Sequence, residues 1–484
     1  MKRIIMDINS QQSRIALTEN EILKEFYIER QNYKRIVGNI YKGRVENVLP
    51  GMQAAFINIG IEKNTFLHIK DASALIEKDE NEDFDWPPIN KILKQGQELL
   101  VQVIKEPIAQ KGARVNTNIT LPGRYIVLMP TSDYIGISRR IEQEKERIRL
   151  RSIAQECKPE EMGVIIRTEA EGIEKEEFIS DLNFLIRLWE KIKNKDRLSV
   201  APKLIHSELE LPYRIVRDLF TKEIDEFIIN NKDYYKKVAE MVDLISCSLK
   251  DRVIYFDEPN ELFSHYNINS QIEDLLCNKI WLSCGGYIVI DQTEALTVVD
   301  VNTGKFVGST NLQDTVLKTN LQAAKEIAKQ LRLRNIGGII IIDFIDMKDS
   351  RDETKVLEKL EECFKDDKTR TNVMGITQLG LVEITRKKAR KSIGRILQEP
   401  CPLCSGTGRV IAMDTLFIHI DDILRKNPHL KEEENLKILL HPHTAHRFEV
   451  DQNNVLVQLK ETYNINFEIL RDTTISINQI KILK

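Results

Sequence analysis

Two apolar runs separated by an amphipathic stretch form the most informative pattern of hydrophobic and polar positions in the chain. The runs, Leu296–Val299 and Ile339–Ile342, are rich in β-branched residues and lack polar residues at alternate positions, so we predict two buried strands. Apolar residues between the runs recur at alternating spacings of four and three, which predicts an amphipathic helix that covers the sheet. The helix positions are Leu317, Leu321, Ala324, Ala328 and Leu331.

Carboxylates follow both runs. Asp300 and Asp343 come directly after them, and Asn302 lies beside the first, so these side chains can converge at one sheet edge. Oxygen ligands suit Mg²⁺ or Mn²⁺ better than zinc or copper, and Mg²⁺ usually takes one or two protein carboxylates plus water and phosphate oxygens. The pattern predicts a magnesium site acting on a phosphodiester, although such carboxylates also form turns or cap helices. Asp346 is a weaker ligand candidate, because positions three apart point to opposite faces unless the strand has ended.

Residues 37–120 contain short β-rich runs separated by glycine turns, which is typical of a small barrel. On such a barrel, Phe56, Phe66, His68 and Lys111 would form a platform on which the bases of single-stranded nucleic acid stack. The alternative is that the two phenylalanines belong to the barrel core.

The charge pattern provides no global basic field. The formal net charge is −3, so any nucleic-acid binding must come from local patches. One such patch, Arg386–Arg395, has six basic residues in ten positions and is either a solvated helix face or an electrostatic rail for an RNA backbone. An acidic stretch at residues 76–88 is not expected to hold RNA.

The length of 484 residues exceeds what a single hydrophobic core supports, so we expect several domains. A hydrophobic fraction of 42% with 30% charged residues is ordinary for a globular protein. No apolar run reaches the length of a membrane span, and the first ten residues turn polar at once, so we expect no span, no signal peptide and a cytoplasmic location. Seven cysteines, mostly isolated, favour a reducing compartment over a disulfide framework.

Cys401 and Cys404 have the spacing of a zinc knuckle in the sequence CPLCSGTG. They supply half of a tetrahedral zinc site. Use as a redox pair is disfavoured, because the thioredoxin-like context is missing. The other two ligands come either from His441, His443 or His446, or from the same cysteine pair of a second chain.

Several long motifs resemble the catalytic half of the ribonuclease E/G family, in the same order and at the same spacing. They include GNIYKGRVENVLPGMQAAFINIG, IIRTEAEG, ALTVVDVNTG, LRNIGGIIIIDFIDM and CPLCSGTG. The organisation is closest to ribonuclease G, because the long tail rich in arginine, proline and acidic residues that ribonuclease E carries is absent. A scaffold role for partner proteins is therefore not expected.

The resemblance implies a discontinuous multidomain architecture of mixed α/β and β class. In its last part, residues 455–470 alternate in a way that predicts strands. The implied parts are a ribonuclease-H-like subdomain from residues 1–35 and 210–275, an inserted S1 barrel of the OB-fold class at 36–121, a 5′-sensor at 122–209, a deoxyribonuclease-I-like catalytic subdomain at 276–399, a zinc link at 400–414 and a small C-terminal domain at 415–484.

The resemblance also implies a pocket for a 5′-monophosphate. Arg167 can grip a terminal phosphate bidentately, and the hydroxyl of Thr168 can donate a hydrogen bond to it. Backbone groups near Gly123 and Val127 would close over the terminal base.

The implied activity is that of a Mg²⁺-dependent endoribonuclease, which hydrolyses single-stranded, A/U-rich RNA with a 5′-monophosphate preference in rRNA processing and mRNA decay. Asp300 and Asp343 would hold the metal, Asn302 would orient the scissile phosphate, and the products would carry 5′-phosphates. Cys401 and Cys404 would bind a structural Zn²⁺ shared between the chains of a homodimer, while pairing into tetramers stays open. The rival hypotheses are a non-catalytic S1-type RNA-binding assembly factor and a metal phosphatase.

Overall fold

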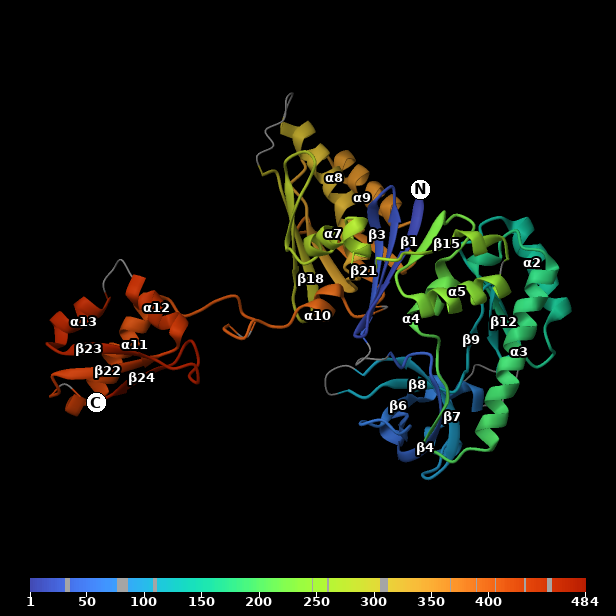
Figure 1. Ribbon diagram of the computed structural model, residues 1–484, viewed down its shortest axis with the longest axis horizontal. Coiled ribbons are helices and arrows are strands. Elements are labelled where there is room, and N and C mark those ends of the chain that lie inside the picture. Colours follow the sequence, from blue (N-terminus) through green and yellow to red (C-terminus); the bar gives the residue numbers. More distant parts are fainter. Residues whose placement is uncertain are drawn as a thin grey trace. The chain divides into compact units, whose positions relative to one another are not determined.

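The protein forms two compact units, Met1–Lys387 and Lys388–Lys484, each described here by itself (Figure 1). Among the described residues, no helix is both long and apolar enough to cross a membrane. The computed structural model describes residues 1–30, 35–75, 86–107, 111–245, 247–258, 261–304, 312–365, 367–388, 390–404, 406–430, 432–450 and 455–484.

The first sheet of the larger unit joins segments that lie about 200 residues apart in the chain. An antiparallel meander at the N-terminus pairs in parallel with two later strands, in the order β15-β14-β1-β2-β3. Ile4 of β1 lies opposite Phe227 of β14, and both are fully buried. The elements are β1 Lys2–Ile8, β2 Gln12–Glu19, β3 Ile22–Arg30, α4 Leu211–Leu219, β14 Glu226–Ile229, α5 Lys232–Ile245, β15 Val253–Tyr255, α6 Leu262–His265 and α7 Ile268–Asp274.

A closed five-stranded barrel follows, which confirms the predicted barrel and is consistent with the S1 or OB-fold class. The strands pair in the order β4-β5-β6-β8-β7, and β7 closes the barrel by pairing with β4. Gly43 permits the close packing, since a Cβ there would lie 2.5 Å from Cγ2 of Ile57. Residues 76–85 of the predicted acidic stretch lie outside the described residues. The elements are β4 Ile40–Leu49, β5 Ala54–Asn58, β6 Thr65–His68, α1 Ile89–Ile92, β7 Glu98–Lys105, β8 Arg114–Asn116 and β13 Lys203–His206, which pairs with the outside of β4.

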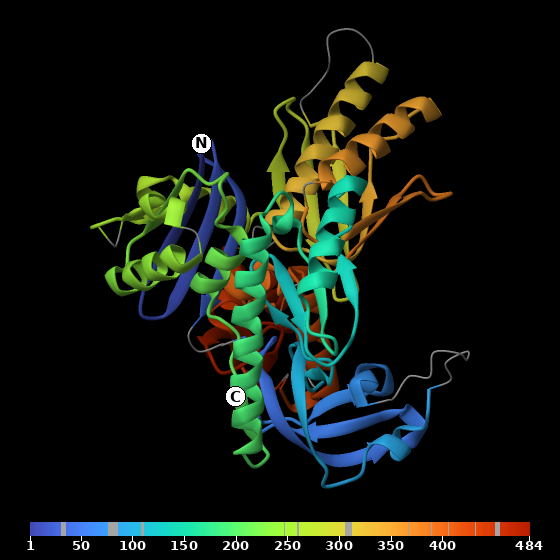
Figure 2. The ribbon, with the colours of Figure 1, turned by 90° about the vertical axis from the view of Figure 1, so that its right-hand side faces the viewer.

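The next layer is a small four-stranded sheet covered by two helices. Its strands have the order β11-β12-β10-β9. The long helix α3 begins with a capping box between Glu174 and Glu177 and runs beside the sheet (Figure 2). The elements are β9 Leu121–Pro122, β10 Ile126–Met129, β11 Ile135–Ile137, α2 Glu144–Cys157, β12 Gly163–Ile166 and α3 Lys175–Arg197.

The last sheet of the larger unit has six strands in the order β16-β17-β18-β19-β21-β20. The predicted amphipathic helix is confirmed as α8, which lies beside α9 on one face (Figure 1). The prediction of strands buried on both faces was wrong, because Val298 and Ile339 are 36% and 53% exposed on the other face. The elements are β16 Lys279–Trp281, β17 Tyr287–Gln292, β18 Leu296–Asn302, α8 Leu312–Leu333, β19 Gly338–Asp343, α9 Ser350–Phe364, β20 Thr371–Ile376 and β21 Val382–Arg386.

The smaller unit contains a three-stranded sheet in the order β23-β22-β24. The prediction of strands throughout 455–470 was wrong in its first half, which forms helix α13. Leu459 and Tyr463, four residues apart, both pack into the core on one helix face, so tertiary packing selected the helical period. The elements are α10 Ile393–Leu397, α11 Met413–Lys426, β22 Asn435–Leu440, α12 Pro442–Val450, α13 Val455–Tyr463, β23 Asn466–Arg471 and β24 Ile480–Leu483.

The first residue of the basic run is not available to RNA. The Nε of Arg386 pairs with Oδ2 of Asp367 at 2.8 Å, and the side chains are only 2% and 4% exposed. Nη1 of Arg386 also donates to the carbonyl oxygen of Ile336 at 2.6 Å. Arg386 therefore belongs to the packing of the six-stranded sheet, and an RNA rail could use only the later residues of the run.

We predict that Arg386→Met lowers the free energy of unfolding by roughly 3–5 kcal/mol, because it leaves the carboxylate of Asp367 buried without its partner. Urea denaturation measures the change. Lys388→Met, at an exposed position of the same basic run, serves as the control and should have little effect. Equal effects of the two substitutions would contradict a structural role for this ion pair.

Candidate active site

The two predicted metal-binding carboxylates lie side by side on neighbouring strands. Asp300 of β18 is paired in register with Asp343 of β19, and the two strands are parallel. Both residues are exposed on the sheet face opposite α8. The predicted meeting at a sheet edge needs a correction, since β18 continues to Asn302 and the carboxylates meet on the open face. Only Asp343 ends its strand.

Asn302 joins this pair from two residues further along β18. Alternate residues of a strand share a face, so its amide lies on the same open face as Asp300. Its Nδ2 donates a hydrogen bond to Oδ2 of Asp300 at 2.7 Å. The structure thus brings the three predicted residues together, and the hydrogen bond restricts the orientation of the Asp300 carboxylate.

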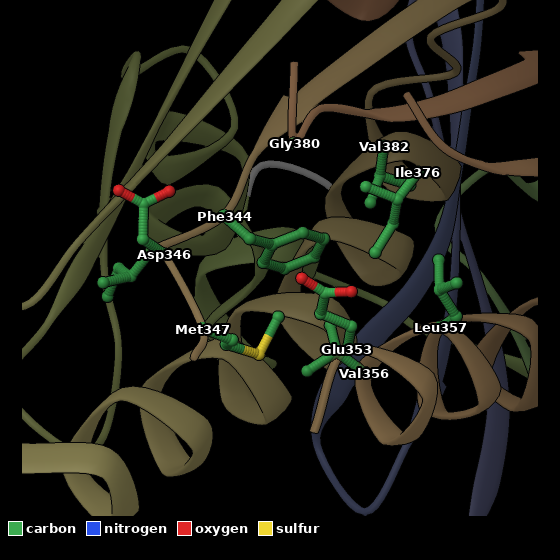
Figure 3. Close-up of a pocket in the computed structure, with 10 residues that line it drawn as sticks. Phe344, Asp346, Met347, Glu353, Val356, Leu357, Ile376, Gly380 and Val382 are labelled. Atoms are coloured by element: carbon green, nitrogen blue, oxygen red, sulfur yellow. The ribbon is translucent and has the colours of Figure 1, made fainter. Parts of the chain in front are cut away.

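Asp346 lies beyond the end of β19, so the argument from strand alternation does not apply to it. It lines a small pocket together with Phe344, Met347 and Glu353, and its carboxylate is directed away from Phe344 and Glu353 (Figure 3). Within the described ranges, no group of three or more His, Cys, Asp or Glu side chains is placed to share a metal. Two carboxylates and an amide nevertheless fit Mg²⁺, which needs only one or two protein carboxylates.

The predicted 5′-phosphate residues also lie together. Val127 of β10 is opposite Ile165 of β12, and Arg167 follows the end of β12. Nη1 of Arg167 donates to the carbonyl oxygen of Gly123 at 2.7 Å and to Oδ1 of Asp218 at 2.8 Å. The hydroxyl oxygens of Thr168 and Ser138 are 2.9 Å apart.

Asp218 therefore belongs to this group of residues, although no pattern in the sequence pointed to it. Burial alone would raise the pKa of Asp218, but its ion pairs with Arg217 and Arg167 outweigh burial and lower that pKa. Asp218 stays ionised at neutral pH and holds the guanidinium of Arg167 in place.

A second unpredicted carboxylate, Asp181, shapes the turn before β10. It accepts hydrogen bonds from the backbone N–H groups of Arg124, Tyr125 and Ile126 at 3.2, 2.8 and 3.1 Å. A Cβ at Gly123 would lie 2.5 Å from Oδ2 of Asp181, so a larger residue there would displace this carboxylate from its backbone donors. Burial raises the pKa of Asp181 despite these donors. The position of Asp181 within the apolar face of α3, one residue before the buried Leu182, was the sequence feature that could have identified it.

The predicted stacking residues of the barrel lie on its surface. Phe56 and Phe66 are opposite each other on β5 and β6, with ring centroids 6.1 Å apart, and His68 is 6.5 Å from Phe66. All three side chains are half-buried, and Lys111 is exposed. The alternative that both phenylalanines fill the barrel core does not describe this arrangement.

The CxxC pair lies in a tight turn of the smaller unit. Cys401 is exposed, and Sγ of Cys404 accepts a hydrogen bond from the backbone N–H of Gly408 at 3.2 Å. This hydrogen bond is the main reason that the pKa of Cys404 is lowered, which favours the thiolate form that binds zinc. In the described part of the chain, no third histidine, cysteine or carboxylate completes a metal site with the pair.

Comparison with known proteins identifies the family. The Ribonuclease E/G family model matches residues 120–389. Ribonuclease G of Haemophilus influenzae is 41% identical over 442 residues, which cover 91% of this chain and 90% of that protein. Ribonuclease G of Escherichia coli strain K12 is 39% identical over 460 residues, which are 94% of each chain. Ribonuclease E of Nostoc sp. is 39% identical over 416 residues, covering 85% of this chain and 59% of that protein.

The chain therefore belongs to the ribonuclease E/G family. With about 40% identity to ribonuclease G proteins over most of its length, it is an endoribonuclease.

Proposed function

We propose that this endoribonuclease depends on Mg²⁺ and hydrolyses single-stranded, A/U-rich RNA, with a preference for 5′-monophosphates, during rRNA processing and mRNA decay. The in-register pair of Asp300 and Asp343 carries the proposal, because two adjacent carboxylates that are exposed among the described residues suit a hydrated metal ion and a phosphodiester. The A/U preference and the RNA classes rest on family membership. A cytoplasmic location agrees with the free cysteines in the described part of the chain.

The roles of the site residues follow from their positions. Asp300 and Asp343 would hold Mg²⁺, which when bound lowers the pKa of a coordinated water and neutralises charge on the scissile phosphate. Asn302 keeps the carboxylate of Asp300 oriented through its 2.7 Å hydrogen bond and presents its amide to a phosphate oxygen. Water as the nucleophile gives 5′-phosphate and 3′-hydroxyl products.

We assign the parts of the chain by the same reasoning. The sheet that unites residues 2–30 with 226–255 supports a ribonuclease-H-like subdomain, and the six-stranded sheet with α8 and α9 supports a deoxyribonuclease-I-like catalytic subdomain. Between them the barrel would bind RNA through Phe56, Phe66 and Lys111, and the four-stranded sheet would present the 5′-sensor.

The assembly proposed for the chain is a homodimer with one shared zinc ion. Cys401 and Cys404 supply two thiolates, and a structural zinc site needs four ligands. A two-fold axis would bring the same pair from a second chain, which makes the metal part of the interface.

The first prediction concerns the metal. Asp300→Asn and Asp343→Asn each keep the side-chain shape but remove one negative charge from the metal site, so cleavage of a 5′-labelled A/U-rich RNA should fall by about two orders of magnitude or more, while RNA binding persists. Asp346→Asn is the matched control and should cost much less. Near-normal cleavage by Asp300→Asn in Mg²⁺ would refute the site.

The second prediction concerns the 5′ end. Arg167 offers one guanidinium already shared with Asp218, which suits a monophosphate better than the bulk and charge of a triphosphate. Wild-type protein should therefore cut monophosphorylated RNA faster, and Arg167→Ala should remove the difference without abolishing cleavage. Arg151→Ala, an exposed arginine on α2, provides the control. A preference that survives in Arg167→Ala would exclude Arg167 from the sensor.

The third prediction concerns assembly. Metal analysis and sedimentation of the wild-type protein should give one zinc per two chains. The double variant Cys401→Ser, Cys404→Ser should lose zinc and the dimer, whereas Cys277→Ser, at an exposed single cysteine, should keep both. One zinc per monomer would instead favour ligands from His441, His443 or His446.

A further inference from the structure

An exposed aromatic cluster lies at the edge of the catalytic sheet, on β16 and β17. The rings of Trp281 and Tyr287 meet edge to face with centroids 5.3 Å apart. The ammonium nitrogen of Lys279 lies 4.5 Å from the centroid of the Trp281 ring and 3.7 Å from that of Tyr287. Trp281 is 58% exposed, which is unusual for so large an apolar side chain.

The strand register places this cluster on the same sheet face as the carboxylates. Trp281 is opposite Tyr287, and Tyr287 is opposite Asn302. Lys279 is opposite Val289, which is itself opposite Asp300. Directly opposed residues share a face, so two parallel rows cross β16, β17 and β18 on this face. One row contains Trp281, Tyr287 and Asn302, and the other contains Lys279, Val289 and Asp300. Two strand spacings, about 10 Å, separate the outer ends of each row.

The chemistry of the cluster matches an unpaired nucleotide. An exposed indole offers a flat face for base stacking that does not depend on the identity of the base. Lys279 forms no ion pair within the described residues, so its charge is available for a phosphate. The indole is not part of the hydrophobic core, which lies on the other face of the sheet, and β16 is an edge strand.

We propose that Trp281, Tyr287 and Lys279 form a subsite for the nucleotide that flanks the scissile phosphate. Trp281 stacks on the unpaired base, Tyr287 supports the indole from its edge, and the ammonium group of Lys279 attracts the adjacent backbone phosphate. The subsite rests on the proposed function, because it takes Asp300 and Asp343 as the point of cleavage. A second copy of the chain is the competing occupant, and the tests below separate the two.

Binding without cleavage provides the first test. A single-stranded A/U-rich oligonucleotide is titrated into metal-free wild-type protein, and tryptophan fluorescence is followed. Binding should quench a component of the fluorescence that is absent in Trp281→Phe, whose ring keeps the affinity within about threefold. Trp281→Ala should weaken binding about tenfold, the effect of losing one stacked base. Met374→Ala, at an equally exposed apolar residue of the opposite edge strand β20, is the control and should leave binding unchanged.

Kinetics with a modified substrate provides the second test. After the cleavage position is mapped on wild-type protein, the bases flanking it are removed in turn to give abasic substrates. For the wild-type protein, the abasic substrate that lacks the stacked base should have a KM about tenfold higher than the intact substrate. For Trp281→Ala, the same abasic and intact substrates should have equal KM values, and kcat should be nearly unchanged for both proteins. Lys279→Gln should make the slope of the logarithm of the binding constant against the logarithm of the salt concentration less steep by about 0.7–0.9, which corresponds to the loss of one phosphate contact.

Three outcomes overturn the subsite. The first is equal RNA binding by Trp281→Ala and wild type. The second is that every abasic position raises KM by the same factor for Trp281→Ala as for wild type. The third is a change in the sedimentation of Trp281→Ala, which would assign the ring to a contact between chains. Absence of RNA cleavage by the wild-type protein would refute the proposed function instead, and the metal-free titration would still decide whether Trp281 binds RNA.

Discussion

The in-register parallel pairing of β18 with β19 is the constraint on which the site depends. It sets Asp300 directly beside Asp343, and adjacent like charges destabilise a sheet. A cation between them would offset that repulsion, and the hydrogen bond from Asn302 already relieves part of it. The parallel connection also requires a crossover, which α8 provides. In the part of the chain that the structure describes, α8 and α9 cover one face of the sheet, and both carboxylates are exposed on the other.

Half-buried carboxylates organise the second group of candidate residues. Asp181 holds the turn before β10 through three backbone N–H groups, and Asp218 holds Arg167 beside the carbonyl of Gly123. The guanidinium is therefore held in one orientation by the chain itself, which would reduce the entropy lost on binding the proposed phosphate. Neither carboxylate stands out in the sequence, since acidic residues on helices are usually solvated. Their importance lies in contacts with groups more than 50 residues away, the backbone N–H of Tyr125 for Asp181 and the guanidinium of Arg167 for Asp218.

Paired aromatic rings recur on two surfaces of the larger unit. Phe56 and Phe66 lie on the barrel, and Trp281 and Tyr287 lie on the catalytic sheet. In both places the rings come from neighbouring antiparallel strands and share one face, because opposed residues of a pair project to the same side. This geometry gathers on one face aromatic side chains that would be ordinary core residues on the other face. The sequence could not distinguish the two faces for Trp281.

The sequence by itself determined the features that local chemistry encodes: helix α8, the barrel strands, the carboxylates that follow apolar β-branched runs, and the cysteine spacing. Tertiary structure decided the rest. Apolar residues on both faces of β18 and β19 suggested full burial, yet Val298 and Ile339 are exposed on the face opposite α8 and α9. The segment that forms α13 was compatible with either period until packing of Leu459 and Tyr463 selected the helix. Arg386 is buried in an ion pair with Asp367, whereas Lys388 of the same basic run is exposed. Periodicity fixes which residues share a face, but only the packing of distant segments determines whether that face is covered.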